Sequence, residues 1–296
     1  MTVEGARLDG LKLFEMPEGS LRDVVRDRLQ AVMREVRTSN GMKVVILDKP
    51  TVRIIGAACR LFDIMEEGVL LVEDLDTNRQ PVPSMEAIYL IEPSEKAVDR
   101  VVKDFPEGGP PHYLAAHVYF TSAPKEALDR LKAQAASHLV SRLRSLKELH
   151  MDFLALESQG YTLGMDDAFH LLYSPQSDSR QATCTKIAEK LLTVLVTLGE
   201  RPQIRFKRAG PGCADNAERV ARSLESALDA FEKQAGGHNP WWRPSKSAPT
   251  TLLILDRADD PLSPLVHEYS YQAMIYDLLE VHQPLVLFAH SSLSQA

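Results

Sequence analysis

Residues 252–279 read LLILDRADDPLSPLVHEYSYQAMIYDLL, a stretch whose order of apolar and charged residues predicts a definite local structure. The continuous apolar run at 252–255 is typical of a strand buried on both faces of a parallel sheet. Charged residues end this run at Asp256. Pro264 suits the first turn of a helix, where its missing N–H leaves no hydrogen bond unmade. The stretch therefore predicts a buried strand, a charged turn and a helix that begins just beyond Ser263-Pro264.

Similar apolar runs recur through the first half of the chain and predict further strands. They lie at residues 44–47, 69–72, 87–91, 118–120 and 153–156. Patterns with helical spacing precede or separate most of these runs, at residues 20–37, 52–65, 94–105 and 125–149. Strands that alternate with helices form a parallel sheet covered by helices on both faces. We therefore expect an α/β domain with about five strands.

A second region with its own apolar patterns follows residue 157. Helices are predicted at residues 185–198, where Gly199 ends the pattern, and at 214–231. A short strand is predicted between them at 204–206. Glycines, prolines and tryptophans gather at 236–249, which predicts a surface loop.

Composition and charge exclude several classes of protein. A net charge of −7 argues against nucleic acid as a main partner, because phosphate binding needs a basic surface. The cysteines at 59, 184 and 213 are widely spaced and odd in number, so they predict neither a disulfide framework nor a metal site. No run has the length of a membrane span, and residues 1–10 lack the apolar core of a secretion signal. We expect a cytoplasmic protein that reaches membranes only through a partner.

A parallel sheet raises the possibility of an enzyme, hydrolase-like or nucleotide-using, with a site at the carboxyl ends of the strands. The best residues for such a site would be Asp48, Asp74 and His117. The turn after Leu47 reads DKPTVR and contains no glycine, although phosphate sites need glycines to bring backbone N–H groups close. We expect Asp48 to cap the helix that follows. The enzyme remains the alternative function.

Two sequence features have part of the pattern of a metal site. His267-Glu268 begins like a zinc-protease motif, but Tyr271 occupies the position that needs the second histidine. The carboxylates within residues 256–260 could attract a divalent cation, but Arg257 lies among them and favours a capping and salt-bridge cluster. We expect no metal, no cofactor and no catalytic residue.

Several stretches carry a resemblance to a known family. The first is LDR-x-x-DP-x-SP-x-x-HE-x-x-x-QAM-x-YDLL at residues 255–279, and the second runs from DIM at 63–65 through VED at 72–74 and PSMEAIYLI at 83–91 to PSEK at 93–96. Further matches are AAHV at 115–118, FT at 120–121, ESQ at 157–159 and YSP at 173–175. In this order the sequence resembles the SM (Sec/Munc) family, soluble syntaxin-binding proteins that regulate SNARE assembly, and its syntaxin-binding branch in particular.

The resemblance implies a domain organisation. Family members are arch-shaped, and they continue well beyond the position that corresponds to Leu279. This implies an N-terminal extension and first helix at 1–42, a syntaxin-contacting α/β first domain at 43–157, an incomplete second α/β domain at 158–250, and the truncated start of a third domain at 251–296. We expect residues 185–279 to be less stable than residues 44–156.

The resemblance also implies a function and the residues that carry it. The chain would be a non-enzymatic syntaxin- and SNARE-binding regulator of vesicle docking, fusion and exocytosis, held at the plasma membrane through syntaxin, with the assembled SNARE complex as a second candidate partner. By family match, Arg53 and Arg60 are the basic positions in the helix after the first strand, and Glu73 is the acidic position at the end of the second strand. From residue types alone, the alternative is ordinary solvated surface charge.

A second family site takes the N-terminal peptide of syntaxin in a pocket with an apolar wall and an acidic residue. Glu148 matches the acidic position. The wall position falls on Asp129 without a gap, or on Leu131 with a two-residue insertion. A carboxylate cannot supply an apolar wall.

Overall fold

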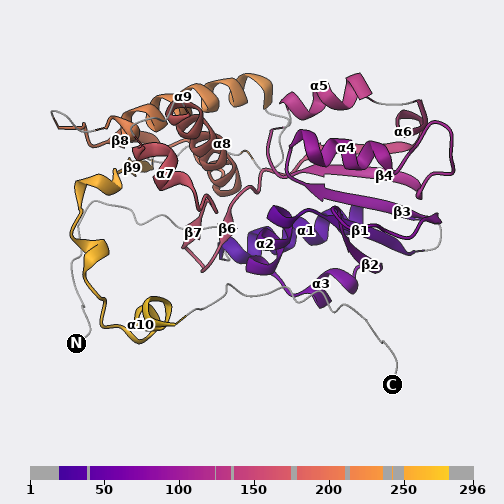
Figure 1. The fold of residues 1–296 in the computed structure, drawn as a ribbon, viewed down its shortest axis with the longest axis horizontal. Helices are drawn as coiled ribbons and strands as arrows, with labels where there is room; N and C mark the ends of the chain where they lie inside the picture. The colour runs from indigo at the N-terminus through magenta and orange to yellow at the C-terminus, as the bar shows by residue number, and fades with distance from the viewer. Residues whose placement is uncertain are drawn as a thin grey trace.

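The structure is a computed structural model that describes residues 20–38, 41–123, 125–134, 137–174, 179–210, 214–235, 242 and 250–279. Figure 1 shows a sheet with helices above and below it, and a second group of elements built around two long helices. The last described helix, α10 (Tyr271–Leu278), lies apart from both groups.

A five-stranded parallel sheet forms the centre of the first group. Its strands follow the order β2-β1-β3-β4-β5, and each neighbouring pair is parallel. The strands are β1 (Lys43–Leu47), β2 (Val69–Asp74), β3 (Val82–Ile91), β4 (Tyr113–Phe120) and β5 (Leu143–Glu148). This confirms the predicted α/β class and the parallel sheet.

Helices cover both faces of this sheet because alternate side chains of each strand point to opposite sides. Val45 and Leu47 of β1 lie in one core cluster, which also contains residues of α1 (Leu21–Glu35), α2 (Lys49–Ala58) and α3 (Leu61–Met65). Val44 and Ile46 lie in the other cluster, with residues of α4 (Glu95–Lys103), α5 (Lys125–Gln134) and α6 (Ser137–Arg142).

Side-chain caps begin α1 and α2, and the second of them is the predicted cap at Asp48. The Ser20 hydroxyl accepts a hydrogen bond from the Asp23 N–H at 3.2 Å, while the Asp23 carboxylate accepts one from the Ser20 N–H at 3.1 Å. Asp48 caps α2 by accepting from the Thr51 N–H at 3.0 Å, and its second oxygen accepts from the Glu92 N–H at 2.6 Å. The bonds from the Asp23 and Thr51 N–H groups satisfy donors that a helix leaves unpaired at its start.

The predicted fifth strand at 153–156 is wrong. Strand β5 lies instead at Leu143–Glu148, within the stretch predicted as the end of a long helix. Leucines three residues apart in this stretch fit a helix, but pairing with the free edge of β4 outweighs that local pattern. Residues 153–155 are buried against α2, whereas Leu156 is exposed. Only the two-residue strand β6 (Leu154–Ala155) forms in this run, antiparallel to β7 (Tyr161–Thr162).

The single helix predicted at 52–65 is two helices. α2 ends at Ala58, and α3 begins after Arg60. The Asp63 carboxylate accepts a hydrogen bond from the Arg60 N–H at 2.8 Å, so a new helix start is capped here.

The second group confirms the predicted helices and strand after residue 157. It contains α7 (Ala168–Tyr173), α8 (Arg180–Leu198), β8 (Gln203–Phe206), α9 (Asn216–Ala235) and β9 (Thr251–Ile254), with β8 and β9 paired in parallel. α8 ends at Gly199, whose φ of 67° suits glycine. Of the predicted loop at 236–249, only Trp242 lies within the described residues.

The stretch at 252–279 differs from its prediction in two ways. The strand forms, but alternate side chains such as Leu253 are exposed, so it is not buried on both faces. Ser263–Leu265 forms only a 3₁₀ turn, and the helix begins later, at Tyr271. The Asp260 carboxylate accepts from the Ser263 N–H at 3.1 Å and stabilises this short turn. Leu265 is 78% exposed, so no core contact favours a longer helix there.

Buried polar groups join the sheet to α8. The Arg28 guanidinium of α1 donates to the carbonyls of Leu149 and His150 at 2.8 and 2.7 Å and to the Thr197 hydroxyl at 3.0 Å. Beside it, Lys190 of α8 forms a buried ion pair with the Asp152 carboxylate. Burial lowers the pKa of Arg28 to about 10, so the guanidinium is still charged at neutral pH.

We expect Gly68→Ala to lower the free energy of unfolding by about 2 kcal/mol. Gly68 has a φ of 81°, and an added Cβ would lie 2.6 Å from the Gly41 carbonyl oxygen. Gly108→Ala is the matched control, because a Cβ there meets no atom within 4 Å. Urea unfolding of both variants measures the difference. Equal stability of the two would contradict this description of the turn before β2.

Candidate partner-binding site

Arg53 lies on α2, the helix that follows β1. Its guanidinium forms an ion pair with the Asp166 carboxylate at 3.3 Å, and both side chains are exposed. An exposed pair of this kind contributes at most about 1 kcal/mol. The Arg53 guanidinium can therefore exchange Asp166 for a carboxylate of a partner at little cost.

Arg60 occupies the junction between α2 and α3. Its backbone N–H is held by Asp63, while its side chain is exposed to solvent. Within the described part of the chain, no carboxylate forms an ion pair with its guanidinium. Arg60 thus presents a positive charge on a fixed backbone.

Glu73 lies near the end of β2, as predicted, but on the other face of the sheet. It pairs with Ile46, whose side chain lies in the core under α4, whereas Arg53 and Arg60 belong to helices on the opposite face. Because β2 is an edge strand, both faces meet at this edge. A partner that contacts all three residues must reach side chains on both faces of the sheet, which meet at the β2 edge.

Glu148 ends β5, at the opposite edge of the sheet. Its carboxylate pairs with the His150 Nδ1 at 2.7 Å and lines a cavity of about 90 Å³. Neither predicted wall residue supplies an exposed apolar surface, because Leu131 is only 6% exposed and the Asp129 carboxylate pairs with Lys132. The apolar lining of the cavity comes from α8 and α9, at Leu192, Ala227, Ala230 and Phe231.

The residues of the enzyme alternative are engaged by separate sets of partners. Asp48 caps α2 as described, and the Asp74 carboxylate accepts from the Asp76 N–H at 2.7 Å. His117 is bonded at both ring nitrogens, to Glu86 at 2.7 Å and Ser145 at 3.0 Å, as a ladder across β3, β4 and β5. Each carboxylate or ring is therefore used in a local structural bond.

The carboxylates that follow β9 are also held locally. Asp256 accepts from the Ala258 N–H at 2.9 Å, and Asp260 pairs with Arg257 at 3.1 Å. This is the capping and salt-bridge cluster predicted from Arg257. Across the described residues, no group of three His, Cys, Asp or Glu side chains is arranged to hold a metal ion.

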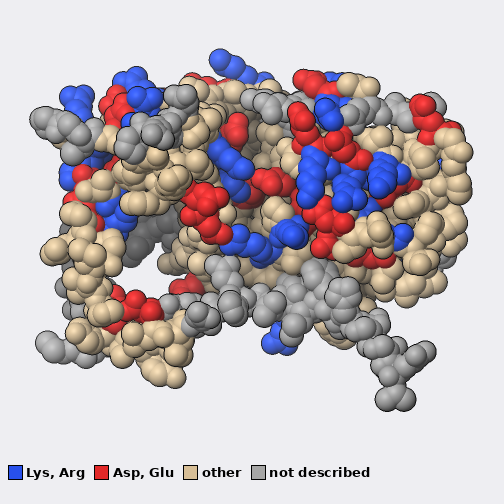
Figure 2. All heavy atoms as spheres, viewed as in Figure 1, with Lys and Arg blue, Asp and Glu red and all other residues tan. Residues whose placement is uncertain are grey.

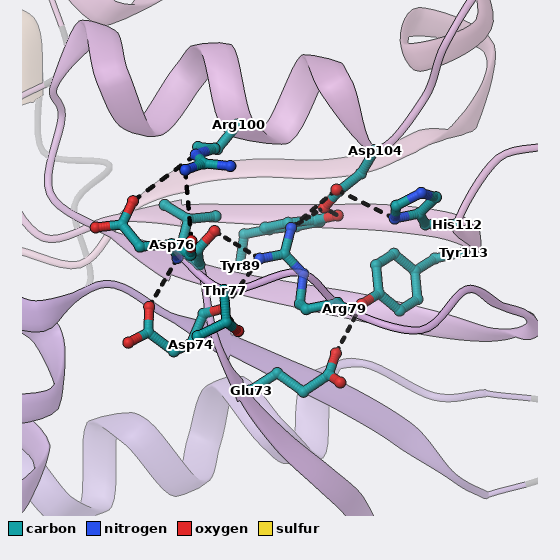
Figure 3. A network of polar contacts seen from close by, with 11 residues as sticks. Glu73, Asp74, Asp76, Thr77, Arg79, Tyr89, Arg100, Asp104, His112 and Tyr113 are labelled. Atoms are coloured by element: carbon teal, nitrogen blue, oxygen red, sulfur yellow. Dashed lines mark hydrogen bonds and ion pairs between the residues drawn. The ribbon is translucent and has the colours of Figure 1, made fainter.

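A buried polar network beside Glu73 was not predicted from the sequence (Figure 3). Arg79 and Asp104 form an ion pair at 2.6 Å, and each side chain is only 4% exposed. The Tyr89 hydroxyl donates to Asp104 at 2.8 Å, and the Tyr113 hydroxyl donates to Glu73 at 2.8 Å. The signal that could have indicated this network is the pair of tyrosines in buried strands, because a buried tyrosine hydroxyl usually finds a polar partner.

Burial and the Asp104 carboxylate shift the pKa values of two members of this network. Burial lowers the pKa of Arg79, but the Asp104 carboxylate outweighs this effect, and the pKa is raised overall. Burial, followed by Asp104, raises the pKa of Tyr89 well above its usual value. The guanidinium therefore stays charged and the phenol stays protonated.

Positive and negative side chains intermingle on the face drawn in Figure 2. Among the described residues on this face, Lys and Arg gather in groups with Asp and Glu beside and between them. Such a mixed surface suits a protein partner that carries both signs of charge.

Comparison with known proteins decides the family. Residues 43–291 match the Sec1 family. The chain belongs to the Sec1 family. This membership confirms the resemblance predicted from residues 63–96 and 255–279.

Two curated relatives of this Sec1-family chain are similar along most of its length. "Protein transport protein sec1" from Dictyostelium discoideum is 39% identical over 265 residues, covering 88% of this chain and 42% of that protein. "SNARE-interacting protein KEULE" from Arabidopsis thaliana is 33% identical over 276 residues, covering 88% of this chain and 40% of that protein. The chain spans less than half the length of these relatives.

Solved structures of similar chains support the fold. A chain in the Unc18–syntaxin 1 complex from Monosiga brevicollis matches with a TM-score of 0.77 and 31% identity, covering 89% of this chain and 44% of that one. The SM protein Vps45 in complex with the Qa SNARE Tlg2 matches with a TM-score of 0.74 at 24% identity and bears on the fold alone. None of the helices within the described ranges is long and apolar enough to cross a membrane.

Proposed function

We propose that this Sec1-family chain is a non-enzymatic regulator that binds a syntaxin-type SNARE in vesicle docking, fusion and exocytosis. One observation carries the proposal: the match to Unc18, solved in complex with syntaxin 1, covers 89% of this chain with a TM-score of 0.77. The printed name of KEULE, a SNARE-interacting protein, supports the same class of partner.

The contact surface in this proposal is the β2 edge of the first domain, residues 43–157. Arg53 and Arg60 supply exposed guanidinium groups, which can pair with carboxylates of the partner in a planar geometry. Glu73 supplies a carboxylate on the other side of the same edge. Charges placed in this way govern the specificity and rate of binding more than its affinity.

Two further parts of the proposal concern location and partners. The chain acts in the cytoplasm and is peripheral to the plasma membrane through syntaxin. The assembled SNARE complex is a second partner for the same mixed-charge surface. Glu148 would contact the N-terminal peptide of syntaxin, with α8 and α9 supplying the apolar wall.

Charge reversal at Arg60 tests the proposal. We expect Arg60→Glu to weaken binding of the cytosolic part of a plasma-membrane syntaxin by about tenfold, because an attractive charge becomes a repulsive one. Thermal stability should not change, since the side chain is exposed. Calorimetric titration measures the dissociation constant.

Arg205→Glu is the matched control for this titration. Arg205 is exposed on β8, outside the first domain, so its reversal should leave the dissociation constant unchanged. No binding by the wild-type chain, or equal constants for Arg60→Glu and wild type, would contradict the proposed function.

A further inference from the structure

We propose that Tyr113 is a positioning residue that holds the Glu73 carboxylate ready for a basic side chain of the partner. This inference rests on the proposed function, in which Glu73 contacts the partner. It adds a residue that lies in the core and never touches the partner itself.

The Tyr113 side chain is held rigidly where it can act on Glu73. It is fully buried at the start of β4, and its ring packs edge-on against Tyr89 with centroids 6.3 Å apart. Its hydroxyl donates to the Glu73 Oε2 at 2.8 Å. Burial and the Glu73 carboxylate raise the pKa of this phenol, so it remains a hydrogen-bond donor throughout the physiological range.

The backbone beside Glu73 is fixed by the same network. One nitrogen of the Arg79 guanidinium donates to the carbonyls of Asp74 and Leu75 at 3.0 and 2.6 Å. The other terminal nitrogen is bound by Asp104, which places the guanidinium (Figure 3). The end of β2 and the Glu73 side chain are thus both held in place before a partner binds.

This geometry leaves a defined role for the second carboxylate oxygen. Tyr113 engages Oε2, and among the described residues no donor engages Oε1. A carboxylate oxygen left free beside a neutral hydrogen bond can accept a charge-assisted bond from an Arg or Lys of the partner. Ordering a flexible glutamate in advance lowers the entropy that binding must remove.

Two tyrosine variants distinguish a positioning role of Tyr113 from a general effect on the stability of the fold. Tyr113→Phe and Tyr89→Phe each remove one buried hydroxyl that donates to a carboxylate, but only the first releases Glu73. In calorimetric titration with the cytosolic part of a plasma-membrane syntaxin, we expect Tyr113→Phe to weaken binding about fivefold and Tyr89→Phe to leave it unchanged. In a Glu73→Gln background, which itself binds more weakly, Tyr113→Phe should weaken binding by less than twofold.

Glu73→Asp provides a second test that changes no buried tyrosine and applies even where a tyrosine variant unfolds. The shorter side chain keeps its charge but draws back from the Tyr113 hydroxyl, so a similar loss of affinity is expected. Wild-type affinity in both Tyr113→Phe and Glu73→Asp would overturn the inference, and equal losses in the two tyrosine variants would do the same.

The outcomes also distinguish this inference from the proposed function. If Arg60→Glu weakens binding but Glu73→Gln does not, Glu73 is not a contact, and only the inference about Tyr113 is wrong. If the wild-type chain does not bind syntaxin, the proposed function and this inference are both wrong.

Discussion

Asp104→Ala should lower the free energy of unfolding by about 3–5 kcal/mol, the largest effect that we expect of a single substitution in this chain. Removal of the carboxylate leaves the Arg79 guanidinium charged and buried, with its side chain 4% exposed. The Tyr89 hydroxyl loses its acceptor in the same step. A buried charge without its partner costs far more than the pair itself contributes.

Asp99→Ala is the matched control on the same helix. Asp99 also binds an arginine through two hydrogen bonds, to Arg130 at 3.1 and 3.0 Å, but both side chains are partly exposed. We expect its removal to cost about 1 kcal/mol or less. Urea unfolding measures the free energy of unfolding of both variants. Similar losses for Asp99→Ala and Asp104→Ala would show that water reaches the Arg79–Asp104 pair.

Arg28→Ala should lower the free energy of unfolding by about 3 kcal/mol. The substitution leaves the Leu149 carbonyl without the side-chain donor that the structure shows, and the His150 carbonyl keeps only the Thr197 hydroxyl, in a site that is almost closed to solvent. The loss is smaller than at Asp104, because removing the guanidinium also ends the cost of burying its charge.

The part of the chain that Arg28→Ala destabilises can be tested as well as the size of the loss in free energy of unfolding. Arg22→Ala, on the exposed side of the same helix, should change stability by no more than about 0.5 kcal/mol. Hydrogen exchange in Arg28→Ala should quicken at residues 149–153 and in α8, the elements that the guanidinium joins. Faster exchange confined to α1 would show that Arg28 stabilises only its own helix.

The central sheet was predictable because its inner strands are buried on both sides. The apolar runs at 44–47 and 87–91 have no alternation to confuse with a helix, and Asp48 and Ser94 mark the helix starts that follow. Strand β5 was not predictable, because an edge strand is half exposed and its leucine spacing also fits a helix. Pairing with β4 depends on residues distant in sequence, which local patterns do not report.

The candidate site was predictable only in part. The family match located Arg53, Arg60 and Glu73, but it could not show that Glu73 points to the other face. That orientation depends on the register of β1 and β2, which shifts between Lys43 and Val44. The Arg79–Asp104 pair joins positions 25 residues apart through side chains alone, and no spacing rule predicts such a contact.

Hydrogen exchange with and without the cytosolic part of a plasma-membrane syntaxin tests the central claim most directly. The proposed contact surface predicts slower exchange on binding at residues 49–65, which contain Arg53 and Arg60, and at residues 69–76, which contain Glu73. Residues 203–206 and 251–254, which form β8 and β9, should exchange at the same rate in both states. Protection of β8 and β9 without protection of residues 49–76 would contradict the claim that the β2 edge of the first domain binds the partner.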